Sequence, residues 1–121
     1  MSDALQPPNP IPDRALRQEE RELIYSLLSG VLAKETLDST LSAARVRDLQ
    51  DGKMGSIRFV RAEPQRFGKV LAEREYEDSD GVLVSIAVNA DHNDQLFELD
   101  FWKVDFSPLR RYPKPSDLVP E

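Results

Sequence analysis

The stretch LFELDFWKVDFSPL, residues 96–109, contains the only tryptophan of the chain and three of its five phenylalanines. Side chains on a β-strand alternate between two faces, so Phe97, Leu99 and Phe101 lie on one side and the carboxylates between them on the other. The stretch therefore predicts a strand with one apolar face, and the other elements are arranged to cover that face.

The alternation changes phase after Phe101, because the next apolar residues are Trp102, Val104 and Phe106. A β-bulge near residues 101–102 would keep both apolar sets on the core side. The polar side of the strand would then carry Glu98, Asp100, Lys103 and Asp105.

With 121 residues the chain has the size of one domain. Cysteine is absent, which excludes disulfides, thiolate metal sites and cysteine nucleophiles, and fits a reducing cytoplasm. No apolar run approaches the ~20 residues of a membrane span. The acidic, proline-rich start lacks the layout of a signal peptide. We therefore expect a cytoplasmic protein without a membrane partner.

The formal net charge of −6 argues against nucleic-acid binding, which depends on a cationic surface. Two interpretations of the acidity remain. It favours a basic protein partner, or it serves only solubility.

Both ends of the chain are rich in proline. Residues 1–12 contain four prolines and predict a disordered tail, and residues 113–121 predict a flexible one. A single α+β domain should therefore occupy residues 13–112.

Residues 18–31 predict an amphipathic helix whose apolar residues recur at three- and four-residue steps, with Gly30 near its end. Residues 33–44 fit a second short helix or a loop. From Arg45 onward the period is two, and strands are predicted at 46–49, 56–61, 67–77, 82–89 and 96–106. The short connections predict a five-stranded antiparallel meander with the N-terminal helix, or both helices, packed on one face.

The polar face of this sheet gathers the candidate binding residues, which are Arg58, Glu73, Glu75, Glu98, Asp100 and Lys103. In a meander Arg58 lies beside Glu73 and Glu75, so a solvated face held by cross-strand ion pairs is the simplest interpretation. Paired carboxylates also suit general acid–base work, provided that a pocket and perturbed pKa values accompany them.

Other motifs predict no metal, cofactor or catalytic residue. The acidic turns 78–81 and 91–94 do not match a calcium-binding loop. His92 is the only histidine and stands in a polar turn without a nucleophile motif nearby. The glycines at positions 52 and 55 fit a turn better than a phosphate loop.

Three segments resemble a family of small bacterial proteins described as a domain of unknown function. They are MGSIRF at 54–59, DGV at 80–82 and FELDFWKVDFSPL at 97–109, with RALRQEE at 14–20 similar to the start of that family. The chain departs from the family pattern at Arg17, where serine or threonine is expected, and at Lys53, where glycine is. The resemblance implies a fold unit over about residues 14–113 and a bacterial cytoplasmic setting.

Two functional hypotheses follow. The first is a non-catalytic binding module, either a small regulator or an immunity-type protein that neutralises a basic partner through the acidic face. The alternative is a small hydrolase or isomerase that uses Glu98 or Asp100 with Arg58. The protein is expected to be a monomer or a homodimer formed through an edge strand.

Overall fold

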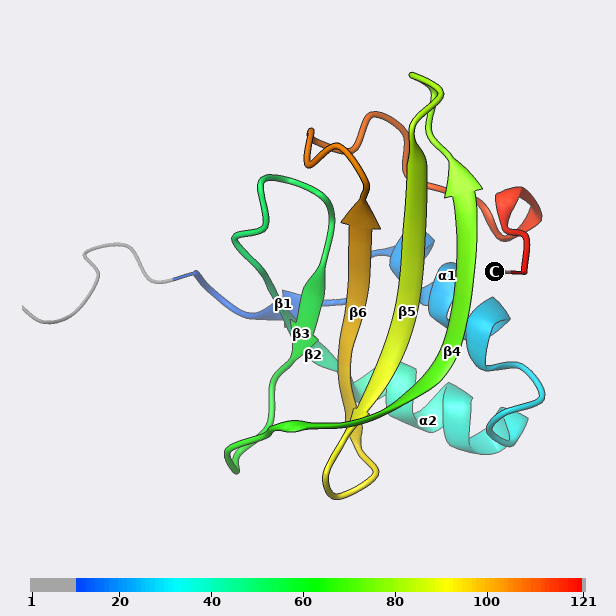
Figure 1. Ribbon diagram of the computed structural model, residues 1–121. Helices are drawn as coiled ribbons and strands as arrows, with labels where there is room; N and C mark the ends of the chain where they lie inside the picture. The colour runs from blue at the N-terminus through cyan, green and yellow to red at the C-terminus, as the bar shows by residue number, and fades with distance from the viewer. Residues whose placement is uncertain (1–10, 121) are drawn as a thin grey trace, which may run out of the picture.

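The computed structural model describes residues 11–120, in which two α-helices cover one face of a six-stranded antiparallel sheet (Figure 1). The helices are α1 (Gln18–Leu28) and α2 (Lys34–Ala43), and a short 3-10 helix, η2 (Pro115–Asp117), lies near the C-terminus. The strands are β1 (Arg14–Ala15), β2 (Arg45–Asp48), β3 (Ile57–Phe59), β4 (Phe67–Glu77), β5 (Leu83–Asp91) and β6 (Leu96–Lys103).

The order of the strands is β1-β2-β3-β6-β5-β4, so the predicted five-stranded meander is wrong in count and in order. The last strand, β6, is inserted between β3 and β5. The α+β class and the antiparallel pairing are confirmed. Because β6 takes the place beside β3, the chain between β3 and β4 must cross the sheet to reach the far edge.

That crossing passes over the ends of β6 and β5 on the face opposite the helices (Figure 1). Its polar contacts with the sheet include those of Gln65, whose side-chain amide donates to the carboxylate of Asp91 at 2.9 Å and to the carbonyl of Leu96 at 3.1 Å. The crossing leads into β4, whose second residue, Gly68, lies at a register shift against β5, and a Cβ atom there would overlap the backbone carbonyl of Asp91. Only glycine fits there.

The helix α1 covers the inner face with the apolar stripe that the sequence predicts, namely Leu23, Ile24, Leu27 and Leu28. It ends earlier than the predicted residue 31, because Gly30 takes a left-handed conformation (φ +86°) that stops the helix. Val31 is consequently 46% exposed. Residues 34–43 form the second helix, with Leu37 and Leu41 buried.

The strand β1 has only two residues, so no periodicity in the sequence predicts it. A cluster of charged side chains holds it in place. Arg14 donates to Glu20 at 2.8 Å and to Asp48 at 2.7 Å, which ties β1 to α1 and to β2. Glu20 also accepts the backbone N–H of Arg17 at 2.8 Å. This carboxylate therefore satisfies a donor at the start of the helix, where Arg17 offers no side-chain cap.

The predicted bulge near residues 101–102 is wrong, because β5 and β6 pair without a shift from Val84–Lys103 to Asn89–Glu98. The register shifts instead beyond Glu98, where Ala90 pairs with Leu96 and Phe97 is the extra residue. Leu99, Phe101 and Lys103 therefore point to the helices, whereas Trp102 points to the open face and is 49% exposed.

The C-terminal segment lies against the free edge of β4. Val119 exchanges two backbone hydrogen bonds of 2.9 Å with Glu75, and Arg111 forms an ion pair of 2.6 Å with Asp117. The hydroxyl of Tyr76 donates to the carbonyl of Arg111 at 2.8 Å. These contacts cover part of the edge that an open sheet otherwise presents to solvent.

The register shift at the start of β4 predicts a specific sensitivity at Gly68. We expect Gly68→Ala to lower the free energy of unfolding by about 2–3 kcal/mol, because the new methyl group overlaps the backbone of Asp91. Urea unfolding followed by circular dichroism measures the change. The control is Gly30→Ala, where space is open and only the positive φ opposes the substitution, at about 1 kcal/mol. Equal losses in the two variants would contradict the close approach.

Candidate functional site

The face of the sheet that the helices leave open carries most of the predicted binding residues. We call this surface the open face. The strand register brings its side chains into rows: Glu73 is paired with Ala87 and Ala87 with Asp100, while Glu75 is paired with Ser85 and Ser85 with Trp102. The small residues of β5 therefore separate the carboxylates of β4 from those of β6.

The meander order predicts that Arg58 lies beside Glu73, and this placement is wrong because β6 stands next to β3. It pairs with Glu98 instead, at 2.9 Å. Its guanidinium also stacks over the ring of Phe97, 4.7 Å from the ring centre. Glu98 additionally accepts from the amide of the buried Asn89 at 3.3 Å. The charge of Glu98 is thus compensated within the fold.

Asp100, a carboxylate of the open face, has a raised pKa. Its side chain is half-buried, and burial raises its pKa, with the nearby negative charge of Glu98 adding to the effect. A hydrogen-bond contact of 3.5 Å with the hydroxyl of Ser56 partly opposes this rise. The alternative enzymatic hypothesis requires such a carboxylate.

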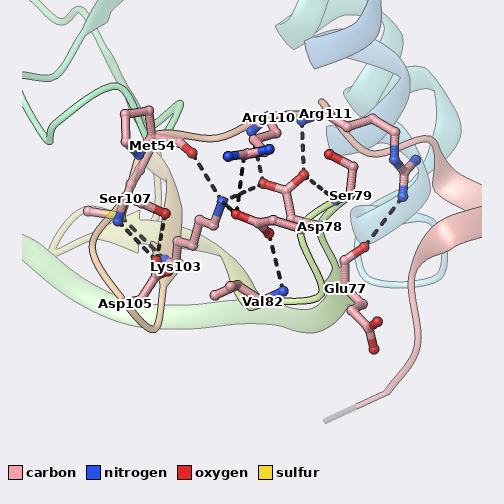
Figure 2. A network of polar contacts seen from close by, with 12 residues as sticks. Met54, Glu77, Asp78, Ser79, Val82, Lys103, Asp105, Ser107, Arg110 and Arg111 are labelled. Atoms are coloured by element: carbon pink, nitrogen blue, oxygen red, sulfur yellow. Dashed lines mark hydrogen bonds and ion pairs between the residues drawn. The ribbon is translucent and has the colours of Figure 1, made fainter.

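The structure corrects the placement of Lys103, which is not on the open face. Its side chain is fully buried on the helix side of β6, where its ammonium group donates to Asp78 at 2.9 Å and to Asp80 at 2.7 Å (Figure 2). A third bond of 3.1 Å reaches the carbonyl of Pro108. Lys103 therefore joins β6 to the β4–β5 turn and to the C-terminal segment.

Asp78 is the second centre of this buried network. Burial acts to raise its pKa, but the backbone N–H of Arg110, the ammonium of Lys103, and the N–H groups of Ser79 and Arg111 outweigh it and lower the pKa to about 2. Figure 2 shows these donors converging on the carboxylate from the turn and from the C-terminal segment. The network is a structural clamp, and it leaves no position for a ligand among its donors.

Four exposed apolar residues gather at the end of the open face near the β4–β5 turn. They are Leu83, Trp102, Val104 and Phe106, each between 41% and 61% exposed. Trp102 and Phe106 make an edge-to-face contact with their ring centres 4.9 Å apart. We call these four residues the aromatic patch. The sequence placed Trp102 in the core only because of the expected bulge, and strict alternation from Leu99 places it outside.

Phe106 occupies a costly conformation within the aromatic patch. Its backbone is left-handed, with φ +63°, which is rare for a bulky side chain and costs about 1–3 kcal/mol. The ring gains little burial in return, because 61% of the residue is exposed. Conformations of this kind are concentrated at functional sites.

Other classes of site find little support in the described part of the chain. Across residues 11–120, no three histidine, aspartate or glutamate side chains are grouped so as to hold a metal ion. In the same residues, no helix has both the length and the apolar character of a transmembrane span. His92 is exposed, and its ring lies 3.3 Å from the side-chain amide of Asn93.

The fold and the open face define a class of small α+β domains in which two helices cover one side of a six-stranded sheet. The family described as a domain of unknown function (DUF6984) matches residues 13–113, and the chain belongs to this family. The resemblance predicted from the sequence is thereby confirmed. No curated protein and no solved structure matches the chain.

Removing the buried cation should destabilise the protein strongly. We expect Lys103→Met to unfold at a markedly lower urea concentration, because the fully buried carboxylate of Asp78 is left without a positive partner and Asp80 keeps only its contact with Arg110 at 3.5 Å. The control is Lys34→Met, which breaks an exposed helical pair with Asp38 at 2.8 Å and should change the midpoint little. Similar midpoints for the two variants would contradict the clamp.

The clamp also predicts an acid dependence. The folded-state pKa of Asp78, about 2, lies below the value of about 4 for a free carboxyl group. Its contribution to stability is therefore complete above about pH 4 and is lost as the pH falls through about 2. The stability gap between wild type and Asp78→Asn should shrink over that interval. Unfolding by urea at successive pH values measures it, and a constant gap would contradict the assignment.

Proposed function

We propose that the protein is a non-catalytic binding module that holds a basic protein partner on its open face. The aromatic patch carries this proposal: Trp102 and Phe106 are exposed beside the carboxylates of Asp100, Glu73 and Glu75 on the side that no helix covers. A small regulator or an immunity-type protein of the bacterial cytoplasm, whose partner is neutralised by capture, agrees with this arrangement.

The chemistry of the surface supports a basic partner with an apolar centre. Tryptophan is among the residues that contribute most binding energy at interfaces when a partner excludes water from it. Its ring also attracts lysine and arginine side chains. The neighbouring carboxylates accept charge-assisted hydrogen bonds from the same cations. The net charge of −6 further accelerates the encounter with a positive surface.

The carboxylates of the open face differ in their positions on the sheet. Glu98 is occupied by Arg58 and Asn89, so it adds little to recognition. Glu73 and Glu75 stand on β4 at the edge of the open face, and Asp100 stands next to Trp102 along β6. The part of the surface that we assign to the partner therefore extends from β4 to the aromatic patch.

The alternative is a small hydrolase or isomerase, and one observation favours it, the raised pKa of Asp100. In that case Asp100 acts as a general acid or base beside Ser56. This hypothesis requires turnover of ester or amide substrates by the wild type that disappears in Asp100→Asn, and the lack of turnover in the wild type would exclude it.

The binding proposal predicts a large effect at the aromatic patch. We expect Trp102→Ala to weaken capture of the partner at least about thirtyfold, the loss typical of an interface residue worth ~2 kcal/mol. Partners are isolated from a lysate of the source organism and their affinity is then measured by calorimetry. The control is Phe67→Ala, because Phe67 is an aromatic residue of similar exposure (55%) outside the patch. Equal affinities in the two variants would refute the assignment.

Charge reversal tests the acidic part of the same surface. Glu73→Lys with Glu75→Lys should reduce the association rate and the affinity for a basic partner. The matched control reverses two exposed carboxylates on the helix side, Glu22→Lys with Glu35→Lys, and changes the net charge by the same amount. If both pairs act alike, only the overall charge matters and the open face is not the site.

A further inference from the structure

The opposite end of the open face carries a hollow that three arginines surround. It lies where the crossing between β3 and β4 leaves the sheet, has a volume of about 380 Å³, and is lined by Arg47, Arg58 and Arg61. We propose that this hollow binds a small organic phosphate, a phosphate monoester with a flat apolar body. This site is separate from the aromatic patch and does not depend on a protein partner.

The positions of Arg47 and Arg58 cause electrostatic repulsion that no contact in the described part of the fold fully offsets. Arg47 and Arg58 are direct cross-strand partners of β2 and β3, and like charges at such positions repel. Arg58 has a carboxylate partner in Glu98. Within residues 11–120, no carboxylate forms an ion pair with Arg47 or Arg61, although the chain has an excess of acidic residues. A bound anion would remove this repulsion.

The charge around the hollow favours an anion. Glu63 lies among the lining residues and Glu98 pairs with Arg58, so these two carboxylates offset two of the three guanidinium groups. One positive charge remains, and the donors of Arg47 and Arg61 have no carboxylate partner among residues 11–120, which suits a phosphate monoester, an anion near neutral pH. Arginine is also the side chain whose planar donors suit phosphate oxygens best.

Apolar residues of the lining supply a surface for the body of the ligand. Leu49, Val60 and Phe97 contribute to it, and the Phe97 ring already carries the Arg58 guanidinium on its face. The size lies within the range of small-molecule sites, about 300–1,000 Å³. The hollow thus combines three cationic side chains with apolar ones.

The wall of the hollow is preformed by the crossing. Gln65 lines it and is held by its two hydrogen bonds to Asp91 and Leu96, and Arg61 donates weakly to the carbonyl of Leu96 at 3.4 Å. Because these contacts exist without a ligand, binding does not require the loop to be ordered first.

Titration of the labelled protein with phenyl phosphate, inorganic phosphate and phenol, at constant ionic strength, tests the proposal by NMR. We expect saturable shifts of the arginine side-chain signals of Arg47, Arg58 and Arg61 and of the amides of residues 60–65. Phenyl phosphate should bind more tightly than inorganic phosphate, and phenol should produce no such shifts. Equal affinity for the two phosphates, or shifts spread over all basic residues without saturation, would overturn the proposal.

A matched pair of variants completes the test. Arg47→Gln should weaken phenyl phosphate binding about tenfold or more, as the loss of one charge-assisted bond predicts. Its thermal stability without ligand should equal or exceed that of the wild type, because the repulsion with Arg58 is removed. Arg66→Gln removes an exposed arginine of the same crossing that does not line the hollow, and should bind as the wild type does. Equal binding by the two variants would overturn the site.

Discussion

The insertion of β6 between β3 and β5 is the constraint on which the rest of the structure depends. A strand that enters the middle of a sheet must be buried on the helix side along its length, and its two neighbours must come from distant parts of the chain. The chain from β3 to β4 then has to cross the open face before β4 can pair with β5, and at the start of that pairing Gly68 lies directly against the backbone of Asp91. Both ends of the open face follow from this geometry, the hollow under the crossing and the aromatic patch where β6 ends.

The burial of Lys103 and the exposure of Trp102 are two consequences of one alternation. With regular pairing from Val84 to Asn89, the side chains at 99, 101 and 103 all face the helices. A lysine in that position is tolerated because Asp78, Asp80 and the carbonyl of Pro108 satisfy its three donors. A bulge that buried Trp102 would have turned Lys103 to solvent and left Asp78 without its cation. The clamp therefore keeps the tryptophan outside.

Local chemistry in the sequence predicts those elements whose signals lie within a few residues. The strand at 67–77 and the turn at 78–81 are found where periodicity and the Asp-Gly pair place them, and the resemblance to the family holds over residues 13–113. The position of β6 is different, because it depends on pairing between strands that are about 40 residues apart. Because of this nonlocal pairing, Arg58 pairs with Glu98 and not with the predicted Glu73, and Lys103 lies in the interior and not on the open face. The sequence signal for the clamp was the aspartate-rich turn at 78–81 together with Lys103, whose position in the alternation that starts from Leu99 is on the core side.

Net charge is a poor guide to what this surface attracts, because the open face is divided. Arginines surround the hollow beside β3, and carboxylates follow β4 at the far edge. Three strand spacings separate β3 from β4 in the order β3-β6-β5-β4, or about 14 Å at ~4.8 Å each. That exceeds the screening length of about 8 Å at physiological ionic strength. The pair formed by Arg58 and Glu98 stands between the two regions and is close to neutral. Each region therefore presents its own local field, so that the proposed basic partner and the proposed phosphate would each meet charges of opposite sign.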